Sequence, residues 1–291
     1  MLDGHRAATR YTYMGMGCSQ AHTVMADGVN EHGLCGATQY IQDGAVYQKA
    51  DGEEGQEAVA AVELLSYLLS SCRNVAEVTE RLRQIRVVGQ VDPVFDSVSP
   101  LHHMFVDRDG NCIVVEYTDR GPDIMENPVG VMTNNPEFRW HLTNLKMQSG
   151  TVPYSLYETK DPKKMTIRSR SLTAQPIPQP GDFSSPSRFI RGASLTSMID
   201  GKFSGLEAVI TGIRVLEAMS VPRGTYFLGG REQYTRYLAL LSPDEPGYYF
   251  KTYHDGDLKR ICLENIKCAS VRELYRITQT VRIQEMLFRE R

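Results

Sequence analysis

Short apolar runs that end in turn residues alternate along this chain with segments whose apolar residues recur every three or four positions. The first pattern is typical of strands, because runs of aromatic and branched residues between turns suit a pleated sheet. Asp109 and Gly110 separate two such runs and form a strong hairpin signal. The predicted strands cover residues 11–16, 33–41, 104–106, 112–117, 129–133, 237–241 and 248–253.

The second pattern predicts helices. One helical face is formed by four apolar residues with this spacing, Val59, Val62, Leu65 and Leu69. A second helix is expected over residues 75–85, because Asn74 followed three residues later by Glu77 is a capping-box signature. We expect these two helices to form an antiparallel pair packed on a sheet. Further helices are predicted over residues 188–199, after a second capping box of Ser204 and Glu207, and over residues 271–289.

Strands and helices occur in blocks, which favours an α+β layered fold. A chain of 291 residues with 41% hydrophobic residues can form one large domain with an ample core, so we assign residues 1–291 to a single domain. Residues 147–187 interrupt this pattern, since they are rich in proline, serine, threonine and lysine and show little periodicity. Such a stretch predicts either a functional loop or an oligomer contact.

Charge and composition narrow the classes of partner. The net charge is −3, which disfavours a nucleic-acid-binding protein, because such proteins usually carry a strongly basic face. No apolar run reaches the roughly 18 residues that a membrane span needs, and residues 1–13 do not resemble a signal peptide. The six cysteines form no C-x-x-C pair. We therefore expect reduced thiols and a cytoplasmic location.

Signals for metal, nucleotide or serine chemistry are weak. The sequence contains neither a phosphate-binding G-x-x-x-x-G-K-[ST] motif nor a G-x-S-x-G motif, and no cofactor is predicted. His102 and His103 suggest a metal site, but adjacent strand residues point to opposite faces, so one of them is expected to face solvent. A Cys112–His102 pair across the hairpin is an alternative. A buried core thiol is the favoured interpretation of Cys112.

Three longer motifs are more informative. Residues 133–136 read T-N-N-P and precede an aromatic residue and a segment ending in N-L. Residues 180–191 read P-G-D-F-S-S-P-S-R-F-I-R, and residues 26–34 read A-D-G-V-N-E-H-G-L. In this order and at these separations the motifs resemble those of the choloylglycine hydrolase and penicillin V acylase family, over nearly the whole chain.

This resemblance implies a four-layer αββα sandwich of the N-terminal-nucleophile kind and hydrolysis of a linear amide by an N-terminal cysteine. The free thiolate attacks the carbonyl carbon, and the α-amine of the same residue carries the proton. The resemblance further implies a small-molecule amide substrate and a homotetramer.

Three residues match functional positions of the family. Asn134 matches an asparagine whose amide donates to the oxyanion, and Arg188 matches an active-site arginine that supports the charged nucleophile. Tyr40 lies where penicillin V acylases have a tyrosine and bile-salt enzymes an asparagine, and its hydroxyl is a candidate second oxyanion contact. The alternatives are a turn asparagine before proline, a surface arginine at a helix start and an ordinary strand tyrosine.

The first family residues, which are the cysteine nucleophile and the arginine and aspartate behind it, have no counterpart in this sequence. Cys18 and Cys35 are not substitutes, because each lies inside the chain without a free amine and is expected to pack in a sheet. The fold is therefore expected to lack its first strands, and the chain as given is expected to be inactive.

Two interpretations stay open: a clipped reading frame of a cysteine amidase, or a non-catalytic relative that binds a ligand or has a structural role. Uncovering several hundred Å² of apolar surface costs on the order of 10 kcal/mol, about the whole stability of a domain, which favours the first interpretation.

Overall fold

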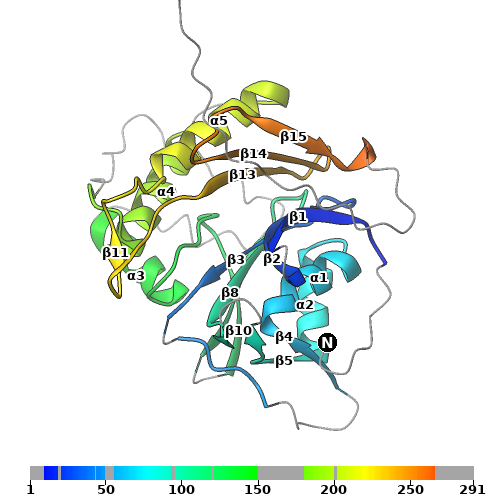
Figure 1. Ribbon diagram of the computed structural model, residues 1–291. Coiled ribbons are helices and arrows are strands. Elements are labelled where there is room, and N and C mark those ends of the chain that lie inside the picture. The colour runs from blue at the N-terminus through cyan, green and yellow to red at the C-terminus, as the bar shows by residue number, and fades with distance from the viewer. Residues whose placement is uncertain are drawn as a thin grey trace, which may run out of the picture.

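The structure is a computed structural model that describes residues 10–18, 21–42, 44–49, 56–92, 96–118, 121–149, 180–199 and 202–265. Its helices and strands stack in four layers (Figure 1). Helices α4 (Ser185–Met198) and α5 (Gly205–Ala218) cover a three-stranded sheet, which faces a six-stranded sheet. Helices α1 (Leu64–Ser71) and α2 (Val75–Gln84) lie on the far side of the six-stranded sheet. The expected α+β, αββα arrangement is confirmed.

The six-stranded sheet is antiparallel and has the order β1-β2-β3-β8-β9-β10. Its strands are β1 (Tyr13–Cys18), β2 (Ala21–Asn30), β3 (Cys35–Tyr40), β8 (Leu101–Val106), β9 (Cys112–Thr118) and β10 (Gly121–Glu126). Gly33 and Gly110 have a φ of 80° in the β2–β3 and β8–β9 turns. Glycine adopts this conformation without steric cost, so both turns stay short and keep consecutive strands paired.

The core between this sheet and its helices follows from the helical periodicity of residues 64–84. Leu65, Leu69 and Val78 are almost fully buried, and they pack in one cluster with Phe105 of the sheet. Asn74 caps α2, because its Oδ1 accepts a hydrogen bond from the Glu77 backbone N–H at 2.9 Å. The predicted cap and the packing of both helices on a sheet are confirmed.

The second sheet consists of β13 (Tyr237–Ser242), β14 (Gly247–Thr252) and β15 (Lys259–Cys262). Buried polar bonds connect it to the six-stranded sheet. The Asp27 carboxyl group on β2 accepts hydrogen bonds from the hydroxyl groups of Tyr237 and Tyr248. The space between the sheets therefore contains a carboxyl group of one sheet that is bound by two tyrosines of the other.

Shorter elements complete the described chain. They are β4 (Glu57–Ala60) with its parallel partner β5 (Ile85–Val88), β6 (Val91–Asp92) with β7 (Ser97–Val98), β11 (Phe227–Leu228) with β12 (Arg231–Glu232), α3 (Phe138–Ser149), and 3-10 turns at Ala61–Glu63 and Leu263–Asn265. Across the described ranges, no helix has the length and apolar character that crossing a bilayer requires.

Three local predictions are wrong. Val59 belongs to strand β4 and not to a helix, because the chain pairs with β5 before it turns into α1. Residues 129–133 form no strand. The Asn127 side chain accepts hydrogen bonds from the N–H groups of Val129 and Gly130 and donates one to the carbonyl oxygen of Val131, so these backbone groups bind a side chain in place of a neighbouring strand. Ser204 makes no capping bond at the start of α5.

The remaining predicted elements have mixed outcomes. Strand β2 was not predicted at all, whereas the β8–β9 hairpin and the β13–β14 pair are confirmed. The excursion predicted for residues 147–187 is narrower, since α3 continues to Ser149 and α4 begins at Ser185. The predicted helix over residues 271–289 lies outside the described residues.

Candidate functional site

The three residues singled out in the sequence meet at the turn before α3. Asn134 Nδ2 donates to the Tyr40 carbonyl oxygen at 2.9 Å, and Asn134 Oδ1 accepts from Arg188 Nη2 at 2.7 Å. A guanidinium group can only donate and a carbonyl oxygen can only accept, so these partners fix which end of the amide is oxygen. The site is thus assembled from the end of β3, the turn that leads into α3 and the first turn of α4.

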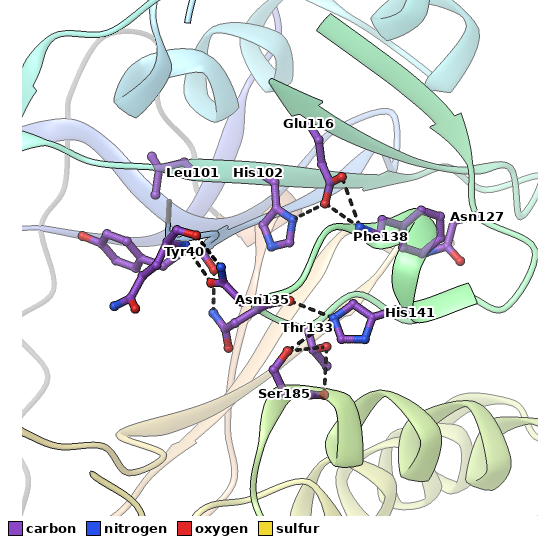
Figure 2. Close-up of polar contacts among 12 residues, drawn as sticks. Tyr40, Leu101, His102, Glu116, Asn127, Thr133, Asn135, Phe138, His141 and Ser185 are labelled. Atoms are coloured by element: carbon purple, nitrogen blue, oxygen red, sulfur yellow. Dashed lines mark hydrogen bonds and ion pairs between the residues drawn. The ribbon is translucent and has the colours of Figure 1, made fainter. Parts of the chain in front are cut away.

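Asn135, the next residue, attaches the same turn to β3. Its Oδ1 accepts from the Gln42 backbone N–H at 2.7 Å, and its Nδ2 donates to the Gln42 carbonyl oxygen. The two asparagine side chains therefore bind the backbone of residues 40 and 42 in the way a neighbouring strand binds a sheet edge. This pairing explains why two consecutive asparagines stand here and why the turn is held at the end of β3 (Figure 2).

Arg188 brings a positive charge to the site without an acidic partner. Its Nε donates to the Phe183 carbonyl oxygen at 3.1 Å, and burial lowers the pKa of the guanidinium group. Within the described residues, no carboxylate lies within ion-pair distance of it. A guanidinium group in this condition favours an incoming negative charge, because burial costs the charged form and a nearby anion compensates that cost.

The P-G-D-F-S-S-P-S-R-F-I-R motif builds the start of α4 that positions Arg188. Ser184 is the N-cap, and its side chain accepts from the Ser187 backbone N–H. Asp182 accepts from the Ser184 N–H and the Ser187 hydroxyl group. The Ser184 side chain, the Ser187 side chain and the Ser184 N–H, in that order, lower its carboxyl pKa to about 2. Buried Arg191 donates to the carbonyl oxygens of Pro180 and Asp182. The loop of residues 180–184 is therefore fixed by hydrogen bonds from Ser187 and Arg191 of the helix that follows it.

Tyr40 contributes to the cluster through its backbone. Its hydroxyl group lies 3.3 Å from Ser99 Oγ, and its side chain is 37% exposed. In Figure 2 the ring extends away from His141 and Ser185 on the other side of the turn. The structure thus connects Tyr40 to Asn134 by the carbonyl oxygen, whereas the sequence had drawn attention to the hydroxyl.

The expectation that one histidine of the His102–His103 pair faces solvent is wrong. The two rings do lie on opposite faces of β8, but both are buried, because both faces of the sheet are covered at this position. His102 Nδ1 lies 2.9 Å from Glu116 Oε1, so the suggested Cys112–His102 pair does not form. Burial lowers the pKa of His103 to about 3.

Sequence reasoning missed two residues that surround the site. Glu116 is 2% exposed in its side chain and accepts from the Phe138 backbone N–H at the start of α3. His141 donates from Nε2 to the Asn134 carbonyl oxygen at 2.9 Å. A charged residue inside the apolar strand Cys112–Thr118 was a usable signal for Glu116, because buried charges are rare without a specific partner.

Three buried thiols are unsuited to nucleophilic attack. Cys35, Cys72 and Cys112 are buried, and burial raises the pKa of the Cys35 and Cys112 thiols to about 12. The reactive form of cysteine is the thiolate, which such surroundings disfavour. The interpretation of Cys112 as a buried core thiol is confirmed.

Comparison with known proteins identifies structures with a similar fold. Two facing sheets between helices are shared with a crystal structure of a variant of conjugated bile acid hydrolase from Clostridium perfringens, with a TM-score of 0.76, 24% identity, and coverage of 95% of this chain and 84% of that one. Penicillin V acylase from Agrobacterium tumefaciens gives a TM-score of 0.65 at 20% identity, with coverage of 84% and 68%. These likenesses confirm the αββα fold.

The family follows from the sequence as a whole. The profile of the linear amide C–N hydrolases, choloylglycine hydrolase family, matches residues 2–274. A bile salt hydrolase/transferase from Clostridium perfringens is 29% identical over 290 residues, which cover 96% of this chain and 85% of that protein. The chain belongs to the choloylglycine hydrolase family of linear amide C–N hydrolases.

Proposed function

We propose that Asn134, Arg188 and Tyr40 form the part of an amide-hydrolysing active site that stabilises negative charge. A thiolate attacks the carbonyl carbon of a linear amide, and the carbonyl oxygen becomes an oxyanion that needs hydrogen-bond donors. The fixed orientation of the Asn134 amide supports this role. One Nδ2 hydrogen binds the Tyr40 carbonyl, and the second has no partner among the described residues, so it is available to a substrate.

Arg188 has a complementary role in this proposal. It binds Asn134 Oδ1, which polarises the amide and strengthens its Nδ2–H as a donor. Its own charge, which no described carboxylate neutralises, stabilises the thiolate before attack and the tetrahedral intermediate afterwards. The strengthened Asn134 donor interacts more strongly as negative charge develops on the carbonyl oxygen, and an interaction that is stronger in the transition state accelerates the reaction.

For Tyr40 we propose anchoring of Asn134 through the backbone carbonyl. The exposed ring contacts the acyl group of the substrate. A hydrogen bond from the Tyr40 hydroxyl to the oxyanion stays a prediction, and the bond between that hydroxyl and Ser99 competes with it.

The thiolate of the proposed reaction belongs to an N-terminal cysteine, as the family resemblance implies. Its own α-amine accepts the proton from the thiol and later gives it to the leaving amine. Cys35, Cys72 and Cys112 are buried, and the partly exposed Cys262 lies inside the chain and has no free α-amine for this role. We therefore propose that the 291-residue chain alone does not turn over amides.

The wider setting is also a proposal. The substrate is a small-molecule amide of the kind that bile salt hydrolases or penicillin V acylases cleave. The assembly is a homotetramer formed by single-domain chains, as the family resemblance implies, and the location is cytoplasmic. Size-exclusion chromatography with light scattering tests the tetramer, which is supported if the mass is four times 32.7 kDa.

A chimera tests the catalytic proposal. The N-terminal segment of the Clostridium perfringens bile salt hydrolase, beginning with its cysteine nucleophile, is joined ahead of the first strand of this chain. We expect hydrolysis of penicillin V or glycocholate by the chimera and none by the unmodified chain. In the chimera, Asn134→Ala should lower kcat roughly 10²–10³-fold, as expected for loss of an oxyanion donor.

Three results contradict the proposal in different ways. Turnover by the unmodified chain shows that another nucleophile acts. An unchanged kcat for Asn134→Ala reduces Asn134 to a turn residue. A folded chimera that binds both amides but hydrolyses neither supports the non-catalytic interpretation. Circular dichroism and thermal unfolding of each variant establish that the comparison is made between folded proteins.

A further inference from the structure

A buried acid–histidine pair lies in the sheet beneath the site. Glu116 on β9 and His102 on β8 have side chains that are 2% and 1% exposed, and His102 Nδ1 lies 2.9 Å from Glu116 Oε1. The pair is outside the cluster of Tyr40, Asn134 and Arg188. Figure 2 shows the His102 ring directed from the strand toward the turn that carries Asn135.

Glu116 is the N-terminal cap of helix α3. The Phe138 backbone N–H, the first of the helix, points at both carboxylate oxygens, with distances of 3.0 Å to Oε1 and 3.1 Å to Oε2. A negative charge at this end of a helix is favourable, because the first N–H groups lack intrahelical partners and the helix dipole is positive there. The cap comes from the central sheet, whereas α4 is capped locally by Ser184.

The same helix holds the backbone of Asn134. The turn that contains Asn134 runs directly into α3, and His141 within the first turn of the helix donates to the Asn134 carbonyl oxygen at 2.9 Å. The side chain of Asn134 is fixed by other elements, β3 and α4. A displacement of the start of α3 therefore moves the Asn134 backbone relative to the partners of its own amide.

We propose that Glu116 and His102 are positioning residues for Asn134: they fix the start of α3 to the six-stranded sheet and so set the direction of the Asn134 amide. This inference rests on the proposed function of Asn134. His102 orients the Glu116 carboxylate, Glu116 holds Phe138, and the helix start holds the turn. Neither residue touches the substrate.

Stability alone does not account for this pair. Two buried ionisable groups cost desolvation energy, and apolar residues of similar size are often as good or better for stability. In addition, His102 Nε2 has no protein partner within the described residues, so the ring does not belong to a polar network in which every buried group is paired. What the pair provides is a fixed distance between β8, β9 and the first residue of α3.

The chain offers a matched control at the same helix. Asp123 on β10 pairs with Arg139 of α3 at 2.8 Å, and the Arg139 side chain is 57% exposed. This ion pair also joins the sheet to α3, but it lies at the surface and binds neither the first N–H of the helix nor the Asn134 turn. Asp123→Asn thus removes a contact between sheet and helix without removing the cap.

The test follows the Asn134 side-chain amide by NMR in the full chain labelled with 15N-asparagine. The Asn134 signal is assigned by its loss in Asn134→Ser. We expect Glu116→Leu to shift or split this signal, His102→Leu to shift it less, and Glu116→Gln to restore most of the wild-type position, because a glutamine oxygen can still accept from Phe138. Asp123→Asn is expected to leave the signal unchanged.

An unmoved Asn134 signal in folded Glu116→Leu and His102→Leu overturns the proposal. If Glu116→Leu does not fold, Glu116→Ala and His102→Leu decide in its place, and two unmoved signals again overturn it. Because the readout is the position of an amide and not turnover, a shifted signal in a protein that never hydrolyses amides contradicts the proposed function alone. Equal shifts in Glu116→Leu and Asp123→Asn show a general effect of helix loosening and also overturn the proposal.

Discussion

The Asp27 carboxyl group between the two sheets should make stability depend on pH in a direction opposite to that of most acids. Its Oδ2 accepts from the Tyr237 hydroxyl at 2.6 Å, its Oδ1 accepts from Tyr248, and the Met16 backbone N–H lies 3.4 Å away. Burial is the largest influence and raises the pKa of Asp27, while the hydrogen bonds lower it and compensate only in part. The folded protein therefore holds this proton more tightly than the unfolded chain.

The sign of the effect follows from this difference. Below the unfolded pKa, about 3.9, Asp27 is protonated in both states and its contribution to stability is fully present. As the pH rises through the raised folded pKa, the contribution is lost, at about 1.4 kcal/mol for each unit by which the pKa is raised. Asp27→Asn is a neutral mimic of the protonated acid, with one acceptor and one donor for the two tyrosines, so it should flatten this dependence.

Urea unfolding between pH 4 and pH 8 measures the effect. We expect the stability of Asp27→Asn relative to wild type to increase with pH. Tyr248→Phe should cost about 1–3 kcal/mol, the range for a buried polar group that loses a partner. Tyr249→Phe, one residue along β14, is the matched control and should cost less. If wild type instead gains stability relative to Asp27→Asn as the pH rises, the carboxylate is ionised and well solvated by its partners, and the reasoning from burial is refuted.

Three further predictions concern the site and the core. Arg188→Gln in the chimera should lower kcat/KM for penicillin V by more than tenfold while retaining a bond to Asn134, and an unchanged kcat/KM contradicts the electrostatic role. The chimera should prefer penicillin V or fatty-acyl amides to glycocholate, because Tyr40 adds flat apolar area, and parallel kcat/KM measurements decide this. Phe105→Ala should lower the free energy of unfolding by about 3–5 kcal/mol, measured with urea, because the ring is fully buried; a loss below about 1 kcal/mol contradicts the packing.

The sequence predicted elements well where one local rule dominated. The Asp109-Gly110 turn specified a hairpin, and the spacing of Leu65 and Leu69 specified a helix that the structure confirms. It failed where tertiary partners decide. Val59 fits a helical spacing with Val62, yet a parallel partner strand that arrives after two helices draws it into β4. No local sequence pattern indicates a partner strand that is so distant in the sequence.

The site shows the same division. Asn134 and Arg188 were found because their surroundings resemble a known family, and the structure brings them within hydrogen-bonding distance. Their positioning partners were not found, since Glu116 and His102 lie on different strands and only the antiparallel register of β8 and β9 places them together. The expectation that one of His102 and His103 faces solvent failed for a related reason: alternation gives the face of a strand but not what covers that face.

Asn134 is the point at which these separate features combine. Its side chain is bound by β3 and α4, and its carbonyl oxygen by α3, which is itself held by Glu116 of β9. The elements that fix one amide group thus come from the six-stranded sheet, from the layer formed by α4 and α5, and from α3. A side chain held in this way has little freedom to follow a substrate, so the proposed function requires that its donor already points where the oxyanion forms. The same rigidity means that, in the chimera, a packing change in any of these elements should alter turnover before it unfolds the protein, since hydrogen-bond strength falls steeply with geometry.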